Sequence, residues 1–182
     1  MVRVAMLDRD GVLNHDRVDY IKNADELEVF PFAREAVETF RRAGWLVYVV
    51  SNQSVVARGL ASADDVDAAT AKLIREVGPL DGVFYCYHKP DDGCGCRKPE
   101  PGLLRQALAA AAEVGPVEDC WMVGDSARDV EAGRRAGCRI AVVLSGHLSA
   151  EEAQRLEPPA DVVARNLWEA AEAIVTFGER GD

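Results

Sequence analysis

The chain has 182 residues, 48% of them hydrophobic and 29% charged, a balance that suits one globular domain with a sizeable core. Its net charge of −10 argues against nucleic acid as a substrate, because binding a phosphate backbone needs clustered Lys and Arg. No apolar run reaches the ~20 residues of a membrane span and no signal peptide is visible, so we expect a cytoplasmic protein without a membrane partner.

Strand-like and helix-like segments alternate along the chain. Hydrophobic runs predict strands at residues 3–7, 45–50, 83–86, 120–123, 139–144 and 161–163. Helical spacing predicts helices at 31–43, 62–77, 101–114, 127–136 and 166–177, and Ser149-Ala-Glu-Glu152 has the pattern of a capping box. The alternation predicts an α/β fold, a Rossmann-like parallel sheet with helices on both faces, whose ligands bind at the carboxyl ends of the strands.

The loops of this fold carry no large insertion. The stretch between Gly11 and Glu28 is too polar for the core, so residues 11–22 are interpreted as a flap over the site. No other insertion is long enough for a separate cap domain. We therefore expect residues 1–182 to form one capless domain with its site open on top.

Four short segments predict a phosphate-transfer site. They are Asp8-Arg9-Asp10-Gly11-Val12, Ser51-Asn52-Gln53, Arg97-Lys98-Pro99 and Gly124-Asp125-Ser126-Ala127-Arg128-Asp129. Three of them directly follow a strand-like run, so the sheet brings them to one edge. Carboxylates, a hydroxyl and a lysine at successive strand ends are what hydrolysis of a phosphate ester on a carboxylate nucleophile needs.

The first segment carries two carboxylates spaced i, i+2. Alone, Asp-x-Asp-Gly is as well explained by two acidic loop residues or a helix cap. In a phosphate site, Asp8 is the nucleophile that forms an aspartyl-phosphate, and Asp10 protonates the leaving alcohol and then activates water. Because these carboxylates repel a dianionic substrate, a divalent cation is required, and Mg²⁺ suits Asp8, the backbone carbonyl of Asp10 and Asp125 as oxygen ligands.

Three further residues complete this interpretation. The hydroxyl of Ser51, otherwise an ordinary strand-end serine, would hold the transferring phosphoryl group. Lys98, otherwise a solvated surface lysine, would supply a fixed positive charge for the developing phosphorane. Asp129 lies one helical turn after Asp125 and either orients Lys98 or is a surface carboxylate; the sequence leaves both open.

A cysteine-rich loop predicts a second metal. Cys86, His88, Cys94 and Cys96 follow the pattern C-x-H-x5-C-x-C, and an odd total of five cysteines argues against a disulfide framework. Three thiolates and one imidazole complete a tetrahedral Zn²⁺ set, so the loop 86–96 is expected to hold a structural zinc that fixes Lys98. The alternative is three buried cysteines and a chance histidine. Cys120 and Cys138, in or beside strands, are interpreted as core residues.

These motifs resemble those of the haloacid dehalogenase-like (HAD-like) phosphatases, in the branch of the heptose 1,7-bisphosphate 7-phosphatases and histidinol-phosphatases. The resemblance runs from Val4 to about Leu148. The segments 7–14, 51–59, 96–99 and 123–126 carry it. It implies a capless Rossmann-like fold, Mg²⁺-dependent phosphomonoester hydrolysis and a structural zinc, with removal of the 7-phosphate of a heptose 1,7-bisphosphate as the expected activity.

The resemblance also implies a set of substrate-binding residues. The candidates are Asp16, Asp19, Asn52, Gln53, Ser54, Arg97, Ser126 and Arg128. Arg97 would bind the second phosphate or the sugar. The family has Lys or Arg directly after Gly-Asp, where this chain has Ser126, so Arg128 is the candidate replacement.

Several alternatives stay open. The segment Asn52–Gly59 resembles the heptose enzymes and the short cysteine loop resembles the histidinol enzymes, so histidinol phosphate or another small sugar phosphate is the alternative substrate. A polynucleotide 3′-phosphatase shares the first motif, but the acidic charge counts against it. A non-catalytic receiver-like phosphoacceptor would not need Asp10, and a zinc-only scaffold leaves Asp8, Asp10 and Asp125 unexplained. The small capless members of the family suggest a monomer.

Overall fold

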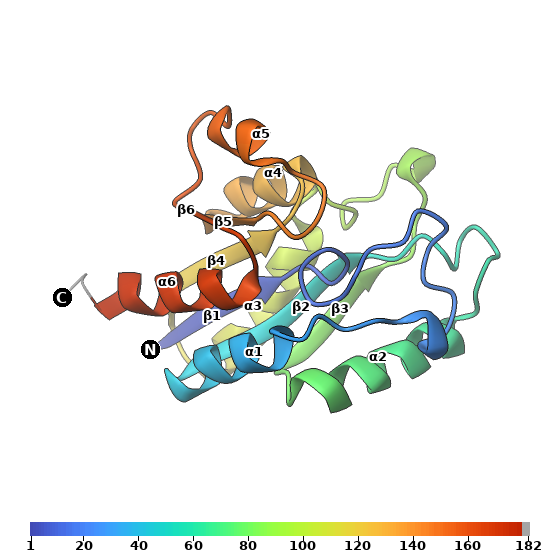
Figure 1. Cartoon of the computed structure of the whole chain (residues 1–182), viewed down its shortest axis with the longest axis horizontal. Coiled ribbons are helices and arrows are strands. Elements are labelled where there is room, and N and C mark those ends of the chain that lie inside the picture. Colours follow the sequence, from blue (N-terminus) through green and yellow to red (C-terminus); the bar gives the residue numbers. More distant parts are fainter. Residues whose placement is uncertain (180–182) are drawn as a thin grey trace.

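The computed structural model describes residues 1–179. Six parallel strands form one sheet in the order β3-β2-β1-β4-β5-β6 (Figure 1). The strands are β1 (Val2–Leu7), β2 (Trp45–Asn52), β3 (Gly82–Cys86), β4 (Val117–Gly124), β5 (Arg139–Val143) and β6 (Val162–Ala164). The predicted parallel α/β sheet is confirmed, with each expected strand present.

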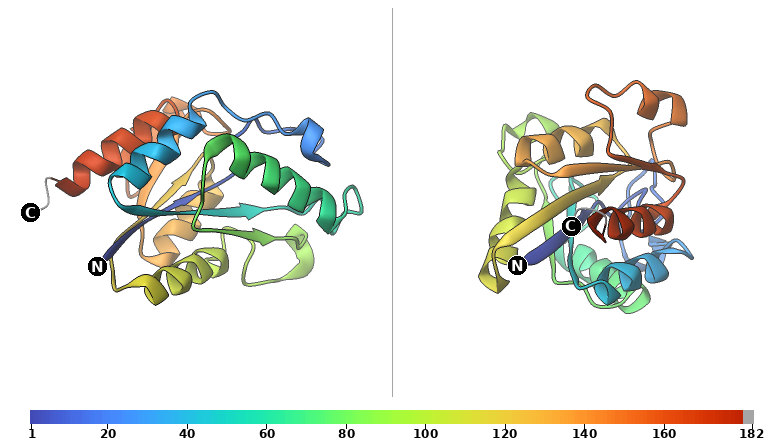
Figure 2. Two further views of the ribbon diagram at one scale, coloured as in Figure 1. Left: turned by 90° about the horizontal axis from the view of Figure 1, so that it is seen from below. Right: turned by 90° about the vertical axis from the view of Figure 1, so that its left-hand side faces the viewer.

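Helices cover both faces of the sheet, as the alternation predicts. They are α1 (Ala33–Arg42), α2 (Ala63–Val77), α3 (Gly102–Val114), α4 (Ala127–Ala136), α5 (Ala150–Gln154) and α6 (Leu167–Glu179). Figure 2 shows α1, α2 and α6 on one side of the sheet and α3 on the other. Among the described residues, none of the helices combines the length and the apolar character that a membrane span requires.

The strand residues alternate between two cores. Ala5 and Leu7 pack with α1 and α6, whereas Val4 and Met6 pack with α3 and α4. This period of two, with both directions apolar, is what a parallel sheet buried on both faces requires. The sheet is therefore a rigid platform, and the polar side chains collect at its carboxyl edge.

The chain reverses its direction of sheet growth between β1 and β4. From β1 it builds outward through β2 and β3, and it then returns to place β4 on the other side of β1. The loops after β1 and β4 therefore separate at their carboxyl ends, which is where open α/β sheets form a ligand crevice. Asp8 follows β1 and Asp125 follows β4, so the switch point lies between two predicted metal ligands.

The segment between Gly11 and Glu28 differs from the sequence-based expectation. Its polar middle is exposed, but Val12, Leu13, Ile21 and Leu27 are buried in the core with α1. The prediction that this stretch is too polar for the core was wrong at both of its ends. Apolar anchors there hold the exposed residues 15–19 over the strand ends, and a short 3-10 helix at Ala24–Glu26 closes the segment.

Candidate active site

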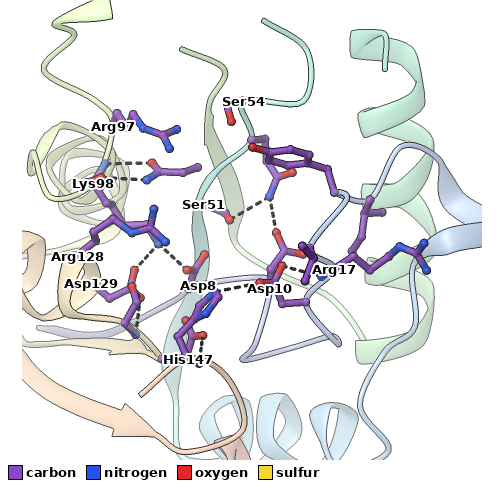
Figure 3. A pocket seen from close by; sticks show the side chains of 18 residues that line it. Asp8, Asp10, Arg17, Ser51, Ser54, Arg97, Lys98, Arg128, Asp129 and His147 are labelled. Carbon is purple, nitrogen blue, oxygen red and sulfur yellow. Dashed lines mark hydrogen bonds and ion pairs between the residues drawn. The ribbon is translucent and has the colours of Figure 1, made fainter. Parts of the chain in front are cut away.

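A cavity of about 330 Å³ opens at the carboxyl ends of β1, β2 and β4. Nearly all of the predicted site residues line it: Asp8, Asp10, Asp16, Ser51, Asn52, Gln53, Ser54, Arg97, Lys98, Asp125, Ser126, Arg128 and Asp129. Asp19 instead forms ion pairs with Arg17 and Lys22 on the exposed part of the 11–22 segment. The four sequence segments thus meet in one place, although they come from loops far apart in the chain (Figure 3).

Three carboxylates crowd the floor of this cavity. One oxygen each of Asp8, Asp125 and Asp129 lies within 4.8 Å of the others. Burial, followed by the charges of neighbouring aspartates, raises the pKa of Asp8 to about 7, although Lys98 opposes this. Burial and the charge of Asp129 raise the pKa of Asp125 to about 6. A site that destabilises its own carboxylate charges is one in which a bound cation would be strongly favoured.

Two glycines let the backbone approach Asp125 closely. A Cβ at Gly11 would lie 2.4 Å from Asp125 Oδ2, and one at Gly146 would lie 1.9 Å from the same atom. Gly11 also has a φ of +80°, which favours glycine. The backbone N–H of His147 donates to Asp125 Oδ2 over 2.8 Å, so this buried carboxylate is also held in place by a hydrogen bond from the loop after β5.

Lys98 lies beside the carboxylates in a fully enclosed position. Its Nζ is 3.0 Å from Asp8 Oδ2 and 2.6 Å from Asp129 Oδ1, and it donates to the carbonyl of Val50 over 2.8 Å. Burial alone would lower the pKa of Lys98, but the two aspartates outweigh it and hold that pKa above its ordinary value. Lys98 is thus a fixed cation, and Asp129, itself 1% exposed, is not a surface carboxylate.

Asn52 ties the Lys98 loop to the end of β2. Its side chain donates to the carbonyl of Lys98 and accepts from the Lys98 backbone N–H, both over 3.0 Å. Ser126 serves a similar purpose on α4, where its backbone N–H and its Oγ donate to Asp129 Oδ2 over 3.1 and 2.6 Å. These two residues face the cavity while their hydrogen-bonding groups hold Lys98 and Asp129 in place.

Asp10 sits in a cage of buried donors. The guanidinium of Arg9 donates to both of its oxygens over 3.0–3.1 Å. Asn14 Nδ2 donates to Oδ1 and Gln53 Nε2 to Oδ2, each over 2.8 Å. Gln53 Nε2 also donates to Ser51 Oγ over 3.1 Å, so the end of β2 and the loop after β1 are joined through one amide.

Two arginines extend the site toward the cysteine loop. Arg97 and Arg128 line the first cavity and also a neighbouring cavity of about 490 Å³ beside Cys94 and Gly95. Arg97 donates to the carbonyl of His88 over 3.1 Å. Both cavities thus share Arg97, Lys98 and Arg128 as cationic lining residues, next to the carboxylate cluster.

The cysteine loop brings its four predicted ligands together. Cys86 Sγ lies 3.7 Å from Cys94 Sγ and 3.3 Å from Cys96 Sγ. His88 Nδ1 lies 3.5 Å from Cys86 Sγ and 3.3 Å from Cys96 Sγ. Ligands 2.0–2.3 Å from a tetrahedral zinc are about 3.5–3.8 Å apart. The distances from Cys86 to Cys94 and to His88 lie in that range, and the two distances to Cys96 are shorter, at 3.3 Å.

Comparison with known proteins agrees with a phosphate-transfer site. The family model described as HAD-hydrolase-like matches residues 95–170. The D-glycero-beta-D-manno-heptose-1,7-bisphosphate 7-phosphatase of Pseudomonas aeruginosa is 44% identical over 146 residues, which are 78% of this chain and 80% of that protein. The Bordetella bronchiseptica protein of the same name is 36% identical over 178 residues, covering 96% of this chain and 98% of its own length. The chain belongs to the HAD-like phosphatases.

Solved structures of HAD-like phosphatases also share the fold of this chain. The crystal structure of the B. bronchiseptica D,D-heptose 1,7-bisphosphate phosphatase, complexed with magnesium and phosphate, superposes with a TM-score of 0.82 at 33% identity over 97% of this chain and 99% of that one. The Burkholderia thailandensis D,D-heptose 1,7-bisphosphate phosphatase gives a TM-score of 0.64 at 26% identity over 96% and 99% of the two chains. The expected HAD-like architecture is therefore confirmed along the length of the chain.

Sequence reasoning missed several residues of this HAD-like site, among them Arg17, which lines the cavity, and three whose contacts matter most. Arg9 belongs to the first motif but has no predicted role, and it is the main partner of Asp10. Asn14 supplies the second donor of that cage. His147 follows β5, and its Nε2 lies 2.9 Å from Asp16 Oδ2. This contact joins the 11–22 segment to the loop whose backbone holds Asp125. Its position after a strand end was the one signal available for His147.

Proposed function

We propose that this chain removes the 7-phosphate from a D-glycero-D-manno-heptose 1,7-bisphosphate through a covalent intermediate on Asp8. The observation that carries the proposal is the grouping of Asp8, Asp125 and the enclosed Lys98 at the switch point of the sheet. Relatives at 36–44% identity bear the name of this activity. Histidinol phosphate is the alternative substrate that the experiment below tests.

Asp8 attacks the phosphorus atom, and the bond to the leaving sugar oxygen breaks as the aspartyl-phosphate forms. Lys98 and the hydroxyl of Ser51 stabilise the charge that develops on the phosphoryl oxygens. Asp10 delivers a proton to the leaving oxygen and later takes one from the attacking water. For this, Asp10 exchanges one contact of its cage for the substrate, since Arg9, Asn14 and Gln53 together occupy both of its oxygens.

The residues present fit both predicted metals. Asp8, Asp125 and the backbone carbonyl of Asp10 would hold Mg²⁺, whose charge would offset the repulsion between these carboxylates and a dianionic phosphate. The raised pKa values of Asp8 and Asp125 are the reason to expect a cation there. Asp129 is the third carboxylate of the cluster, but its oxygens are engaged by Lys98 and Ser126, so it orients Lys98.

A zinc ion would be held by Cys86, His88, Cys94 and Cys96 in a closed set of four ligands. Such a set leaves no position for water, so its contribution is structural. Lys98 follows Cys96 by two residues, and zinc would therefore fix the loop that presents the lysine.

The distal phosphate would bind near Arg97 and Arg128. Both arginines line the two adjoining cavities, so a bisphosphate with one end at Asp8 has a basic partner for its other end. An Arg–phosphate hydrogen bond contributes roughly 1.5–3 kcal/mol. Arg97→Ala should therefore lower kcat/KM on the bisphosphate by about ten- to a hundredfold, since about 1.4 kcal/mol is a factor of ten.

The decisive experiment compares substrates under identical Mg²⁺. Values of kcat/KM are measured for both anomers of the heptose bisphosphate, for histidinol phosphate and for p-nitrophenyl phosphate, with Asp8→Asn as the inactive control. Arg97→Ala should leave kcat/KM on p-nitrophenyl phosphate nearly unchanged. Arg105 is an exposed arginine of α3, and Arg105→Ala should leave kcat/KM unchanged on both the bisphosphate and p-nitrophenyl phosphate. A preference for histidinol phosphate, or equal losses on both substrates in Arg97→Ala, would refute the bisphosphate assignment.

A further inference from the structure

Two cysteines outside the cysteine loop lie at the opposite end of the sheet from the cavity. Cys120 is in β4, and Cys138 directly precedes β5. The strands pair with Trp121 opposite Arg139, so one residue earlier the two cysteines face each other across neighbouring strands. Gly124 ends β4 four residues after Cys120, about 13 Å along the strand at roughly 3.3 Å per residue.

The two sulfur atoms are unusually close. Cys120 Sγ lies 3.1 Å from Cys138 Sγ. Nonbonded carbon atoms pack about 3.5–4.0 Å apart, and sulfur is larger than carbon, so this is less than an ordinary packing contact. Adjacent strands lie about 4.8 Å apart, which falls within the range of Cα separations that disulfides span. An approach of about 1 Å would bring the sulfurs to bonding distance.

The pair is accessible from one side only. Cys138 is buried, 8% exposed, in the core with α3 and α4. Cys120 is half-buried and lines a surface hollow of about 270 Å³ together with Asp119 and Arg139, which form an ion pair over 3.1 Å. A small oxidant can therefore reach Cys120, whereas Cys138 is positioned to react only with its neighbour.

We propose that Cys120 and Cys138 form a reversible disulfide that closes the segment carrying Asp125 and Asp129. With a hydroperoxide as oxidant, the Cys120 thiolate attacks the terminal peroxide oxygen, an S–O bond forms and the O–O bond breaks, giving a sulfenic acid. The leaving alkoxide takes up the proton that the Cys120 thiol released and departs as an alcohol, or as water when the oxidant is hydrogen peroxide. The Cys138 sulfur then attacks the Cys120 sulfur, the S–S bond forms, and the hydroxyl leaves as water with the Cys138 proton. Two electrons pass from the thiols to the peroxide, and a dithiol reductant reverses the reaction.

The order of attack agrees with the ionisation of the two thiols. The hydrogen bond between them lowers the pKa of Cys120 and raises that of Cys138. Cys120 is thus the sulfur that ionises first, and it is also the one that faces the hollow. The sequence-based interpretation of both cysteines as core residues agrees with the buried Cys138, whereas Cys120 packs against the same core but is only half-buried and also lines the hollow.

Oxidation should stabilise the fold and leave catalysis unchanged. The bond closes a loop from 120 to 138, and a closed loop of that size restricts the unfolded chain by about 3 kcal/mol, which raises the Tm by about 6–12 °C. The pair lies a strand's length from the cavity, so kcat on p-nitrophenyl phosphate should stay within about twofold. This inference does not depend on the identity of the substrate.

The test uses the zinc-loaded full chain treated with limiting hydrogen peroxide and then with dithiothreitol. Peptide mass spectrometry should find Cys120 linked to Cys138, with the loss of two hydrogen atoms, and the Tm should rise and return. Zinc release is followed in parallel, because oxidation of Cys86, Cys94 or Cys96 would lower the Tm instead. Cys120→Ala and Cys138→Ala should each abolish the Tm rise.

Other outcomes overturn the proposal. Thiols that remain free in the wild-type chain after peroxide treatment, a sulfinic acid at Cys120 without a link, or a link between two chains would each exclude the intramolecular disulfide. The mass spectrum of the wild-type chain decides this even if an alanine variant folds poorly. A link without any change in Tm would exclude its stabilising role.

Discussion

Asp129→Asn separates the two functions of one buried carboxylate. Asp129 Oδ2 accepts hydrogen bonds from Ser126 at the start of α4, and Oδ1 lies 2.6 Å from Lys98 Nζ. Asp65 provides a matched control, because its Oδ2 accepts from the Ser62 N–H and Oγ over 2.9 and 2.6 Å at the start of α2. The two capping boxes are alike, but Asp65 is only half-buried and its side-chain hydrogen bonds are to Ser62 alone.

The magnitudes follow from this difference. Losing charge at a cap outside the buried core costs about 0.5–1 kcal/mol. Removing one partner of a buried ion pair costs about 3–5 kcal/mol. The lower end applies here, because Asp8 and the carbonyl of Val50 still hold Lys98 and because repulsion between Asp129 and Asp8 is relieved. We expect Asp129→Asn to lower the free energy of unfolding by about 3 kcal/mol, or about 6–12 °C in Tm.

Urea unfolding of the zinc-loaded chain, with Tm as a second measurement, gives both values. Asp65→Asn should lower the Tm by about 1–4 °C and leave turnover unchanged. In Asp129→Asn, Lys98 is held less firmly, so kcat should also fall by about tenfold or more. If the two variants lose the same stability within about 0.5 kcal/mol, the Lys98–Asp129 contact stabilises nothing beyond the cap and the reasoning fails.

Three further predictions test the metals and the acid. Asp10→Asn should slow an alkyl phosphate more than p-nitrophenyl phosphate, whose leaving group needs no proton; equal losses would remove Asp10 from that role. The purified chain should carry close to one zinc, and its chelation should lower the Tm in a way that Mg²⁺ does not restore; elemental analysis without zinc would contradict this. The pKa values of about 7 for Asp8 and about 6 for Asp125 lie above the ordinary 3.8. Between about pH 4 and 7 the folded, metal-free chain therefore holds protons that the unfolded chain has lost, so the free energy of unfolding falls as the pH rises through this range. The affinity for Mg²⁺ should increase over the same rise in pH, because the two carboxylates lose the protons that compete with the cation. Mg²⁺-dependent Tm shifts at pH 5.5 and 7.5 measure this, and equal affinities would contradict it.

The sequence was sufficient to predict the sheet because its signals are local. Apolar runs of four to eight residues mark strands wherever both faces are buried. The largest differences are at β2, which extends to Asn52 instead of residue 50, and at β4, which spans Val117–Gly124 instead of 120–123. The two 3-10 helices, Ala24–Glu26 and Pro90–Asp92, were not predicted, since three residues carry no periodicity.

The hydrogen-bond partners of the predicted site residues could not be predicted from the sequence. Strand ends identify which side chains meet, but not which atoms they contact. The bond from Gln53 to Asp10 spans 43 positions of sequence and the bonds from Asn52 to Lys98 span 46, and no spacing rule relates such pairs. Burial of the apolar anchors in the 11–28 stretch could not be predicted either, because Val12-Leu13 is a single pair and Ile21 and Leu27 are single residues, rather than a periodic run.

The predicted zinc loop adjoins the active site through more than Lys98. The carbonyl of Cys86 accepts the backbone N–H of Gln53 over 2.7 Å, and the Gln53 side chain in turn donates to Asp10. Tyr85, next to Cys86, lies beneath the Arg9 guanidinium, with the ring centroid 5.7 Å from the Arg9 carbon. The predicted zinc ligand Cys86 therefore adjoins Gln53 and Arg9, which hold Asp10, and the predicted ligand Cys96 lies two residues before Lys98. Loss of zinc should consequently reduce leaving-group protonation as well as charge stabilisation, so a zinc-depleted chain that still folds should lose more activity on alkyl phosphates than on p-nitrophenyl phosphate.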